Sequence, residues 1–340
     1  MARRASVSPA TVSRVLNRRP HVRPEVRAAV ERAVAALGFR PNPVARSLVG
    51  GGSRTLGLIV ADITNPFYAE TAKAIVETAR GRGYMVVLCN TDNLPRLQAE
   101  QIRMLREQRV EGIILGSVHR RDPAAEELVA SRFPCVMYNR RLASQAGTFV
   151  VLDNVRGAEE VTRHFIELAH RRIAFLAGPP SFSTAAERLT GYRRALAHAG
   201  IPFDRRLVRQ GQFKAELAYQ AARELLQQRP RPTAIVAGND LTALAVLDAA
   251  AHLGVRVPED VGVSGFDDIE LAGSERIQLT TVGQQKAEMG RLAVNYLLEL
   301  VEARDGLRRD PIHHVLPPTL VVRRSCGAMA GARVRRAATL

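Results

Sequence analysis

The stretch TLGLIVADITNPFY, residues 55–68, runs from apolar residues typical of a buried strand into a polar turn with two adjacent aromatic residues. Comparable apolar runs occur at 84–92, 110–117, 133–141, 149–154, 171–179, 233–240 and 261–268. Stretches with helical spacing separate most of these runs, for example residues 67–80 and 215–228. This alternation predicts parallel sheets covered by helices on both faces. More than eight strands suit two doubly wound sheets rather than one, so we expect an α/β core of two lobes.

Polar and aromatic residues follow several of the expected strands. In open parallel sheets, ligands bind outside the carboxyl ends of the strands. Those positions hold residues 62–68 and then Phe182, Thr184, Arg188, Gln212, Phe213, Asn239, Asp240, Asp267 and Asp268. An arginine, an amide, carboxylates and flat aromatic faces suit a polyhydroxylated ligand such as a sugar. The alternative is local: Asn239 and Asp240 cap a helix that begins at Leu241, and the carboxylates form surface turns.

The segment SVSPATVSRVLN, residues 6–17, has the pattern of the turn and second helix of a DNA-reading motif. Ser8 followed by Pro9 predicts a helix start, because the hydroxyl accepts from a free backbone N–H and proline fits the first helical position. An apolar stripe of Val12, Val15 and Leu16 lies on one face. An arginine on the other face can grip a guanine edge with two parallel hydrogen bonds. That face carries Pro9, Ala10, Ser13, Arg14 and Asn17. A packed surface helix without a DNA role is the alternative.

The 340-residue chain has a net charge of +16, and the excess is concentrated at its ends. Residues 1–54 contain eleven arginines against Glu25 and Glu31, and the last 18 residues contain five arginines and no acid. The remaining 268 residues hold only +2. A basic head on a nearly neutral body is expected for a protein that binds the phosphates of a nucleic acid.

Residues 24–53 predict the rest of a small helical head and a connector. Pro24 opens a helix with apolar residues at helical spacing, and Gly38 supplies its stop. Asn42 and Pro43 open a second segment, 43–49, and isolated helices of only about seven residues are marginal in water. The sequence GGGS at 50–53 is typical of a flexible connector. We therefore expect a hinge helix that forms only when DNA and a partner chain hold it.

Composition argues against several classes of protein. No run of about 18 apolar residues predicts a membrane span, and the N-terminus lacks the apolar region and cleavage site of a signal peptide. Cys89, Cys135 and Cys326 are odd in number and too far apart for a CxxC site, which indicates reduced thiols in a cytoplasm. No P-loop, HExxH or GxSxG motif occurs, so we expect no enzyme activity, catalytic residue, metal or cofactor. A secreted sugar-binding protein would share the core, but it would need an export signal and no basic head.

Seven motifs occur in order along the chain: VSPATVSRVLN, LGFRPNPVARSL, LGLIVADITNPFY, LAGPPSFSTAAERLTGY, AGNDLTALAVL, SGFDDIELA and LPPTLVVRRS. Through them the chain resembles the lactose/galactose repressor (LacI/GalR) family of bacterial transcription regulators over nearly its whole length. The resemblance implies a helix-turn-helix head and a periplasmic-binding-protein-like core that holds a small effector between two lobes. It also implies a homodimer that binds a palindromic operator in double-stranded DNA and usually acts as a repressor. A solute-binding protein with the same core and a non-functional DNA head is the alternative.

The resemblance also implies roles for individual residues. Pro9, Ala10 and Arg14 would meet bases, and Leu48 would wedge into the minor groove at the operator centre. The other implied DNA contacts are Ser8, Thr11, Ser13, Asn17, His21, Asn42, Val44 and Ala45. The implied effector contacts are Phe67, Tyr68, Phe182, Thr184, Arg188, Phe213, Asn239 and Asp267. Phe182 stands where purine-binding relatives carry an arginine, which argues against a purine effector.

These expectations define four segments and a mechanism. We expect the DNA-binding head at 1–41, the hinge helix and linker at 42–53, the effector-binding and dimerisation core at 54–326, and a disordered basic tail at 327–340. An effector that prefers one closure of the lobes would change the distance between two hinge helices. It can act only through its differential affinity for the two states. Whether it releases DNA or promotes binding stays open at this point.

The first helix of the family's head is largely absent from this sequence. Only MARRAS precedes the recognition segment, with Ala2 and Ala5 in register and Met1 where the family has valine. Because GUG valine codons also serve as bacterial start codons, we expect the gene start to lie a few residues upstream. Ser6 replaces the glycine usual at the turn, at a cost of about 1 kcal/mol if the backbone there is left-handed. We expect residues 2–5 to cover the apolar stripe poorly, which leaves a loosely folded head with weak operator affinity. A degenerate head that no longer reads DNA is the alternative.

Overall fold

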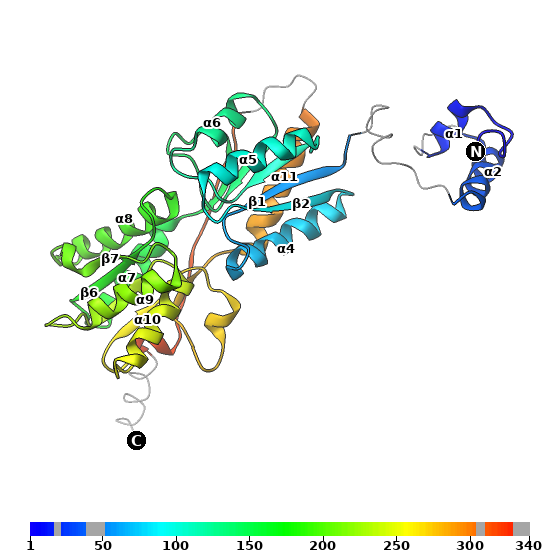
Figure 1. The fold of residues 1–340 in the computed structure, drawn as a ribbon. Helices are drawn as coiled ribbons and strands as arrows, with labels where there is room; N and C mark the ends of the chain where they lie inside the picture. Colours follow the sequence, from blue (N-terminus) through cyan, green and yellow to red (C-terminus); the bar gives the residue numbers. More distant parts are fainter. Residues whose placement is uncertain (17–21, 39–51, 304–309, 329–340) are drawn as a thin grey trace. The chain divides into compact units, whose positions relative to one another are not determined.

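The computed structural model describes residues 1–16, 22–38, 52–303 and 310–328. The chain divides into two compact units, Met1–Arg54 and Thr55–Leu340 (Figure 1). The predicted hinge helix at 43–49 lies outside the described residues, as do Gly50, Gly51 and residues 329–340 of the predicted tail. Within the described residues, no helix combines the length and hydropathy needed to cross a bilayer.

The first unit contains helix α1 (Pro9–Leu16) and helix α2 (Pro24–Ala36). They share a small core whose buried members are Ala5, Val12, Val15, Val30 and Ala33. The expectation that residues 2–5 would leave the apolar stripe poorly covered is wrong for Val12 and Val15, which are buried. Helix α2 supplies the cover, because Val30 and Ala33 lie in the same cluster. The backbone at Ser6 is left-handed, with φ of 52°, so the steric cost expected at this serine applies.

The N-terminal lobe of the second unit is built on a six-stranded parallel sheet in the order β11-β5-β4-β3-β1-β2. Its strands are β1 (Thr55–Val60), β2 (Met85–Asn90), β3 (Gly112–Leu115), β4 (Cys135–Tyr138), β5 (Thr148–Leu152) and β11 (His313–Leu316). Helices α4 (Pro66–Gly81) and α11 (Lys286–Glu302) pack on one face, where Ile75 and Leu297 join Leu58 in one core. Helices α5 (Pro95–Glu107) and α6 (Pro123–Ala130) pack on the other face (Figure 1). Both faces are therefore covered, as buried parallel strands require.

The C-terminal lobe is built on a four-stranded parallel sheet in the order β7-β6-β8-β9. Its strands are β6 (Ile173–Ala177), β7 (Val208–Gln210), β8 (Ala234–Ala237) and β9 (Gly262–Ser264). Its helices are α7 (Asn154–Glu167), α8 (Ser183–His198), α9 (Ala215–Leu226) and α10 (Asp240–His252), with the 3-10 turns η1 (Arg205–Leu207), η2 (Glu270–Gly273) and η4 (Arg324–Cys326). Strands β10 (Thr281–Gly283) and β12 (Thr319–Val321) form a separate antiparallel pair that the sequence did not predict.

The chain passes between the lobes three times. Strand β5 leads into α7 of the C-terminal lobe, β10 precedes α11 of the N-terminal lobe, and β11 precedes β12. Each lobe is therefore assembled from segments distant in sequence, and strand ends from the whole length of the core meet at one boundary. The predicted fold class, a helical head with an α/β core of two parallel-sheet lobes, is confirmed.

Candidate functional site

Helix α1 and its capping residue Ser8 present to solvent six of the twelve residues predicted to contact DNA. Ser8 Oγ accepts a hydrogen bond from Thr11 N at 3.1 Å, which caps the helix as the sequence predicted. The exposed or partly exposed residues of this face are Ser8, Pro9, Ala10, Thr11, Ser13 and Arg14. Small side chains beside one guanidinium can enter a major groove without steric obstruction. The remaining predicted DNA contacts, Asn17, His21, Asn42, Val44, Ala45 and Leu48, lie outside the described residues.

A cavity lies where the strand ends of the two lobes face each other, and we call it the interlobe cleft. Its N-terminal side is lined by Asp62, Asn65, Phe67, Tyr68, Asn93, Asn139 and Arg140. Its C-terminal side is lined by Thr184, Arg188, Phe213, Asn239 and Asp267. Seven of the eight predicted effector residues thus lie together. The eighth, Phe182, stacks on Phe213 with ring centroids 6.3 Å apart.

Each lining segment begins where a parallel strand ends. Phe67 and Tyr68 occupy the first turn of α4, directly after β1, and the Asn65 side chain caps that turn by accepting from Phe67 N at 3.0 Å. Thr184 and Arg188 occupy the first two turns of α8, after β6. The other segments follow β2, β4, β7, β8 and β9 in the same way. Asn239 also caps α10 by accepting from Thr242 N at 2.9 Å. The same residue therefore caps a helix and lines the cleft.

Arg188 and Asp267 form a buried ion pair on the C-terminal side of the interlobe cleft. Arg188 donates from Nη2 to Asp267 Oδ1 at 3.4 Å, from Nε to Asn154 at 2.9 Å and from Nη1 to the Gly238 carbonyl at 2.6 Å. Gln284 donates to the same Asp267 oxygen at 2.6 Å. Burial raises the pKa of Asp267 and lowers the pKa of Arg188, and each partner's charge opposes the shift of the other. The alternative interpretation, in which the carboxylates form surface turns, is wrong for Asp267, which is buried.

A second buried acid, Asp240, lies behind Asp267 at the start of α10. It accepts from the Ile269 backbone N–H at 2.9 Å and shares a 2.6 Å hydrogen bond with the Thr281 hydroxyl. Burial, reinforced by the charge of Asp267, raises the pKa of Asp240 to about 8. This region therefore holds two coupled carboxyl groups that water hardly reaches.

Four lining residues have a left-handed backbone, which non-glycine residues rarely adopt. The φ angles are 61° at Asn93, 63° at Asn139, 56° at Phe213 and 114° at Asp267. Asparagine tolerates this region, but Phe213 and Asp267 bear a cost of about 1 to 3 kcal/mol each that the surrounding packing must offset. Strain of this kind clusters at ligand sites. The strained residues lie at the strand ends, so we infer that this side of the core binds the ligand.

The interlobe cleft also contains residues that sequence reasoning did not select. Asn93 follows β2, and Asn139 and Arg140 follow β4. Asp62 and Asn65 lie in the quoted segment 62–68 but were not chosen as contacts. The rule that found Asn239 and Asp267, polar residues directly after a strand, would have found all five.

The two lobes touch beside the interlobe cleft. Arg120 N donates to the Ser181 carbonyl at 2.7 Å, and Arg141 N donates to Ser183 Oγ at 3.1 Å. Arg141 also forms an ion pair with Glu187 at 2.8 Å. These contacts tie the segments that follow β3 and β4 to the start of α8, so a change in lobe closure must rearrange them.

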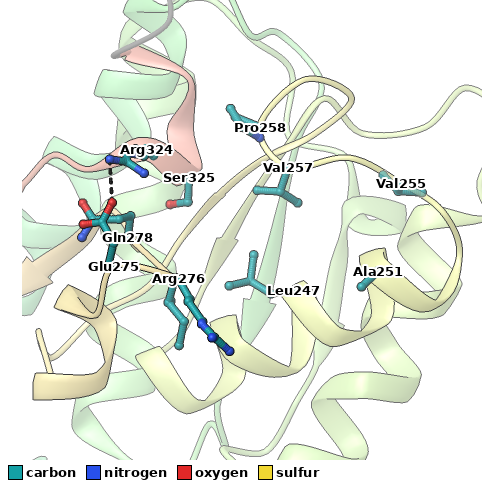
Figure 2. Close-up of a pocket in the computed structure, with 11 residues that line it drawn as sticks. Leu247, Ala251, Val255, Val257, Pro258, Glu275, Arg276, Gln278, Arg324 and Ser325 are labelled. Atoms are coloured by element: carbon teal, nitrogen blue, oxygen red, sulfur yellow. Dashed lines mark ion pairs between the residues drawn. The ribbon is translucent and has the colours of Figure 1, made fainter.

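A larger cavity, which we call the outer cavity, lies in the C-terminal lobe (Figure 2). Its volume is about 390 Å³, and it is lined by Leu247, Ala251, Val255, Val257, Pro258, Glu275, Arg276, Ile277, Gln278, Arg324 and Ser325. None of the predicted effector residues lines it. Glu275 and Arg324 form an ion pair at one side of it at 2.8 Å, and both side chains are mostly exposed to solvent (Figure 2). Six of its lining residues are aliphatic or proline, and the other five are polar or charged.

Family models match both parts of the chain. Residues 1–42 match the model described as "Bacterial regulatory proteins, lacI family". Residues 53–317 match the model described as "Periplasmic binding proteins and sugar binding domain of LacI family".

Relatives and solved structures agree with these matches. The HTH-type transcriptional repressor PurR of Photobacterium profundum is 36% identical over 328 residues, which cover 96% of this chain and 97% of the relative. A transcriptional regulator CelR–cellobiose complex is 34% identical with a TM-score of 0.74 and covers 95% of this chain and 98% of that one. The lac repressor dimer bound to operator and the anti-inducer ONPF is 30% identical with a TM-score of 0.84 and covers 96% and 97%. The resemblance found in the sequence is confirmed, and the chain belongs to the LacI family of bacterial transcriptional regulators.

Proposed function

We propose that this protein binds a palindromic operator as a homodimer and that a sugar or sugar derivative in the interlobe cleft controls the binding. The observation that carries the effector assignment is the convergence of Arg188, Asn239 and Asp267 with Phe67 and Phe213 on one cavity. Sugar hydroxyls need paired donors and acceptors, and sugar C–H faces stack on aromatic rings. The cellobiose complex of the relative CelR supports this ligand class.

The homodimer is supported by an exposed apolar surface on the N-terminal lobe. Strand β2 is an edge strand, and Met85, Val87 and Leu88 on it are 70%, 39% and 44% exposed. Val76 on the neighbouring helix α4 is 42% exposed. An exposed apolar edge strand invites pairing, so proteins normally cover it. We infer that a second copy covers this surface, as the dimeric state of the lac repressor relative suggests.

The proposed mechanism is a shift between two closures of the lobes. The effector would act through its differential affinity for them and so change the spacing of the two heads. The domain limits proposed for this are 1–41 for the head, 42–53 for the hinge helix and linker, 54–326 for the core and 327–340 for the tail. We infer that the protein acts in the cytoplasm, where the DNA lies. We also infer that it acts by binding rather than by catalysis, as a member of a family of transcriptional regulators.

Calorimetry against sugars, sugar phosphates and nucleobases tests the effector class directly. We expect binding from the first two groups, together with a change in operator affinity measured by fluorescence anisotropy. If a nucleobase were the only ligand, the sugar assignment would be wrong.

Replacing the exposed arginine of α1 tests the DNA assignment. Arg14→Ala should relax base preference at one operator position at a cost of about 1 to 3 kcal/mol there, because a guanine contact with two hydrogen bonds is lost. Binding to a panel of operators with single substitutions measures this effect. A salt titration of wild-type binding separates a regulator from a solute-binding protein with a non-functional head, since only phosphate contacts give a steep salt dependence.

A further inference from the structure

Arg140, at the end of β4, is a buried arginine of the interlobe cleft whose hydrogen bonding is incomplete. Its side chain is 4% exposed, and its Nη1 donates to the neutral Asn93 Oδ1 at 2.8 Å. Its Nε is buried and has no hydrogen-bond partner among the residues that the structure describes. Arg188, on the opposite side, differs because it donates to a carboxylate, an amide and a carbonyl.

The charge of Arg140 is also unpaired. Within residues 1–16, 22–38, 52–303 and 310–328, no carboxylate lies within 4.0 Å of its nitrogen atoms. Asp62, the acid on the same side of the interlobe cleft, instead accepts from the backbone N–H and the hydroxyl of Thr64 in its own turn. Asp267 is held by Arg188 and Gln284. A buried charge without a partner is costly, so this arrangement favours binding of an anion.

The geometry of Arg140 fits a planar or tetrahedral oxyanion. Its guanidinium carbon lies 3.6 Å from the centroid of the Phe182 ring, so one face of the group stacks on the ring. The N–H donors of a guanidinium point outward in its plane, where carboxylate and phosphate oxygens can accept two parallel hydrogen bonds. Phe182 stacks in turn on Phe213, and this contact holds the Phe182 ring against the guanidinium.

We propose that the effector carries an anionic oxygen group, a carboxylate or a phosphate, and that Arg140 binds this group. The inference rests on the proposed function, because it presupposes a sugar-type effector in the interlobe cleft. A neutral sugar hydroxyl can also accept from Arg140, but it leaves the buried charge uncompensated. A sugar acid or sugar phosphate therefore binds more tightly than its neutral parent.

The test uses the full-length protein and matched ligand sets. Calorimetry compares glucose with glucuronate and glucose 6-phosphate, galactose with galacturonate and galactose 6-phosphate, and ribose with ribose 5-phosphate. We expect an anionic member of at least one set to bind at least about tenfold more tightly than its neutral parent, the scale of one charge-assisted hydrogen bond. Carboxylate and phosphate members identify which anion the site prefers. A thermal-shift titration with inorganic phosphate, against sodium chloride at equal ionic strength, supplies a probe that needs no sugar.

Three variants assign the preference to Arg140. Arg140→Gln should reduce it to within about twofold and remove the stabilisation by phosphate, whereas Arg140→Lys should retain part of both because it keeps the charge. Arg121→Gln is the control, since it removes one positive charge from an exposed residue of the same lobe. It should retain the full preference.

The outcomes separate this inference from the proposed function. Neutral sugars that bind as tightly as their acids and phosphates would overturn the role of Arg140 and leave the sugar effector intact. An unchanged preference in Arg140→Gln, or equal stabilisation of both proteins by phosphate, would also overturn it. Binding of nucleobases alone would instead overturn the proposed function.

Discussion

Two cavities in the described part of the core differ in character. The interlobe cleft has a volume of about 40 Å³ and is lined by four charged residues, of which Arg140, Arg188 and Asp267 are buried. The outer cavity has about 390 Å³, and the charged pair at one side of it, Glu275 and Arg324, is exposed (Figure 2). The charged pair of the larger cavity is thus exposed, whereas three of the four charged residues of the smaller cavity are buried. The size of a cavity alone does not identify a binding site. Buried polar groups are better markers, because water solvates them incompletely and a bound ligand can supply the missing interactions.

Because acids near the interlobe cleft are buried, we expect the stability of the folded protein to depend on pH. The pKa of Asp240 is about 8 in the folded protein against an ordinary value of 3.8, so the folded state binds the proton more tightly. The contribution of Asp240 to stability should therefore fall as the pH rises from about 4 to about 8 and be constant outside that window. At about 1.4 kcal/mol per pH unit, the loss has a ceiling on the order of 6 kcal/mol.

Asp240→Asn isolates this contribution, because an amide at this position cannot ionise. Urea unfolding of both proteins at a series of pH values gives the difference in unfolding free energy. We expect wild type to lose stability relative to D240N between pH 4 and 8. A difference that is flat across this range would show that Asp240 is not a buried acid, and the contrast between the cavities would weaken.

The second prediction concerns the ion pair of the interlobe cleft. Asp267→Ala leaves Arg188 buried without a carboxylate, which should cost about 3 to 5 kcal/mol of stability. We expect the response to the proposed effector to be lost while operator binding persists, because α1 lies in a different unit of the chain. Calorimetry and fluorescence anisotropy measure the two properties separately.

Asp267→Asn serves as the control for misfolding in this experiment. It retains an acceptor for Gln284 and Arg188 but removes the charge, so its stability should lie between those of wild type and D267A. Effector affinity within twofold of wild type in both variants would exclude Asp267 as a contact.

The sequence predicted much of the interlobe cleft because strand ends are local features. Phe67, Tyr68 and Asn239 each follow a strong apolar run within a few residues, and parallel topology brings such positions together. Strands β10 and β12 escaped prediction because three residues carry almost no periodicity, and only tertiary packing pairs them.

The backbone at Phe213 was equally inaccessible from the sequence. Its left-handed φ of 56° is unfavourable for phenylalanine, so local propensity points away from it. The conformation depends on glycines distant in sequence: a Cβ at Gly178 would lie 2.2 Å from the ring, and one at Gly238 would lie 3.0 Å from it. The residues next to Phe213 in the sequence do not show that Gly178 and Gly238 leave room for its ring.

The third prediction tests this accommodation. Gly178→Ala should displace the Phe213 ring from the interlobe cleft and cost about 1 to 3 kcal/mol, as overpacking of a dense site does. Binding of the proposed effector should weaken with it. Gly81→Ala is the matched control, because a Cβ there meets no atom within 4 Å. Scanning calorimetry should show a lower Tm for the first variant alone, and equal Tm values would mean that the ring adapts freely.

The smallest effect is expected at the outer cavity. Glu275→Ala breaks its ion pair with Arg324, but the two side chains are 77% and 62% exposed, so water solvates the charge that remains. Exposed pairs of this kind contribute at most about 1 kcal/mol. Stability should change by less than that, and the affinity for the proposed effector should be the same as in wild type when both are measured by calorimetry. Because Asp267→Ala and Glu275→Ala each remove one carboxylate from the same lobe, any difference between them reports position and burial rather than net charge. A loss of effector binding in E275A would mean that the outer cavity is coupled to the interlobe cleft, and the distinction between the two cavities would then fail.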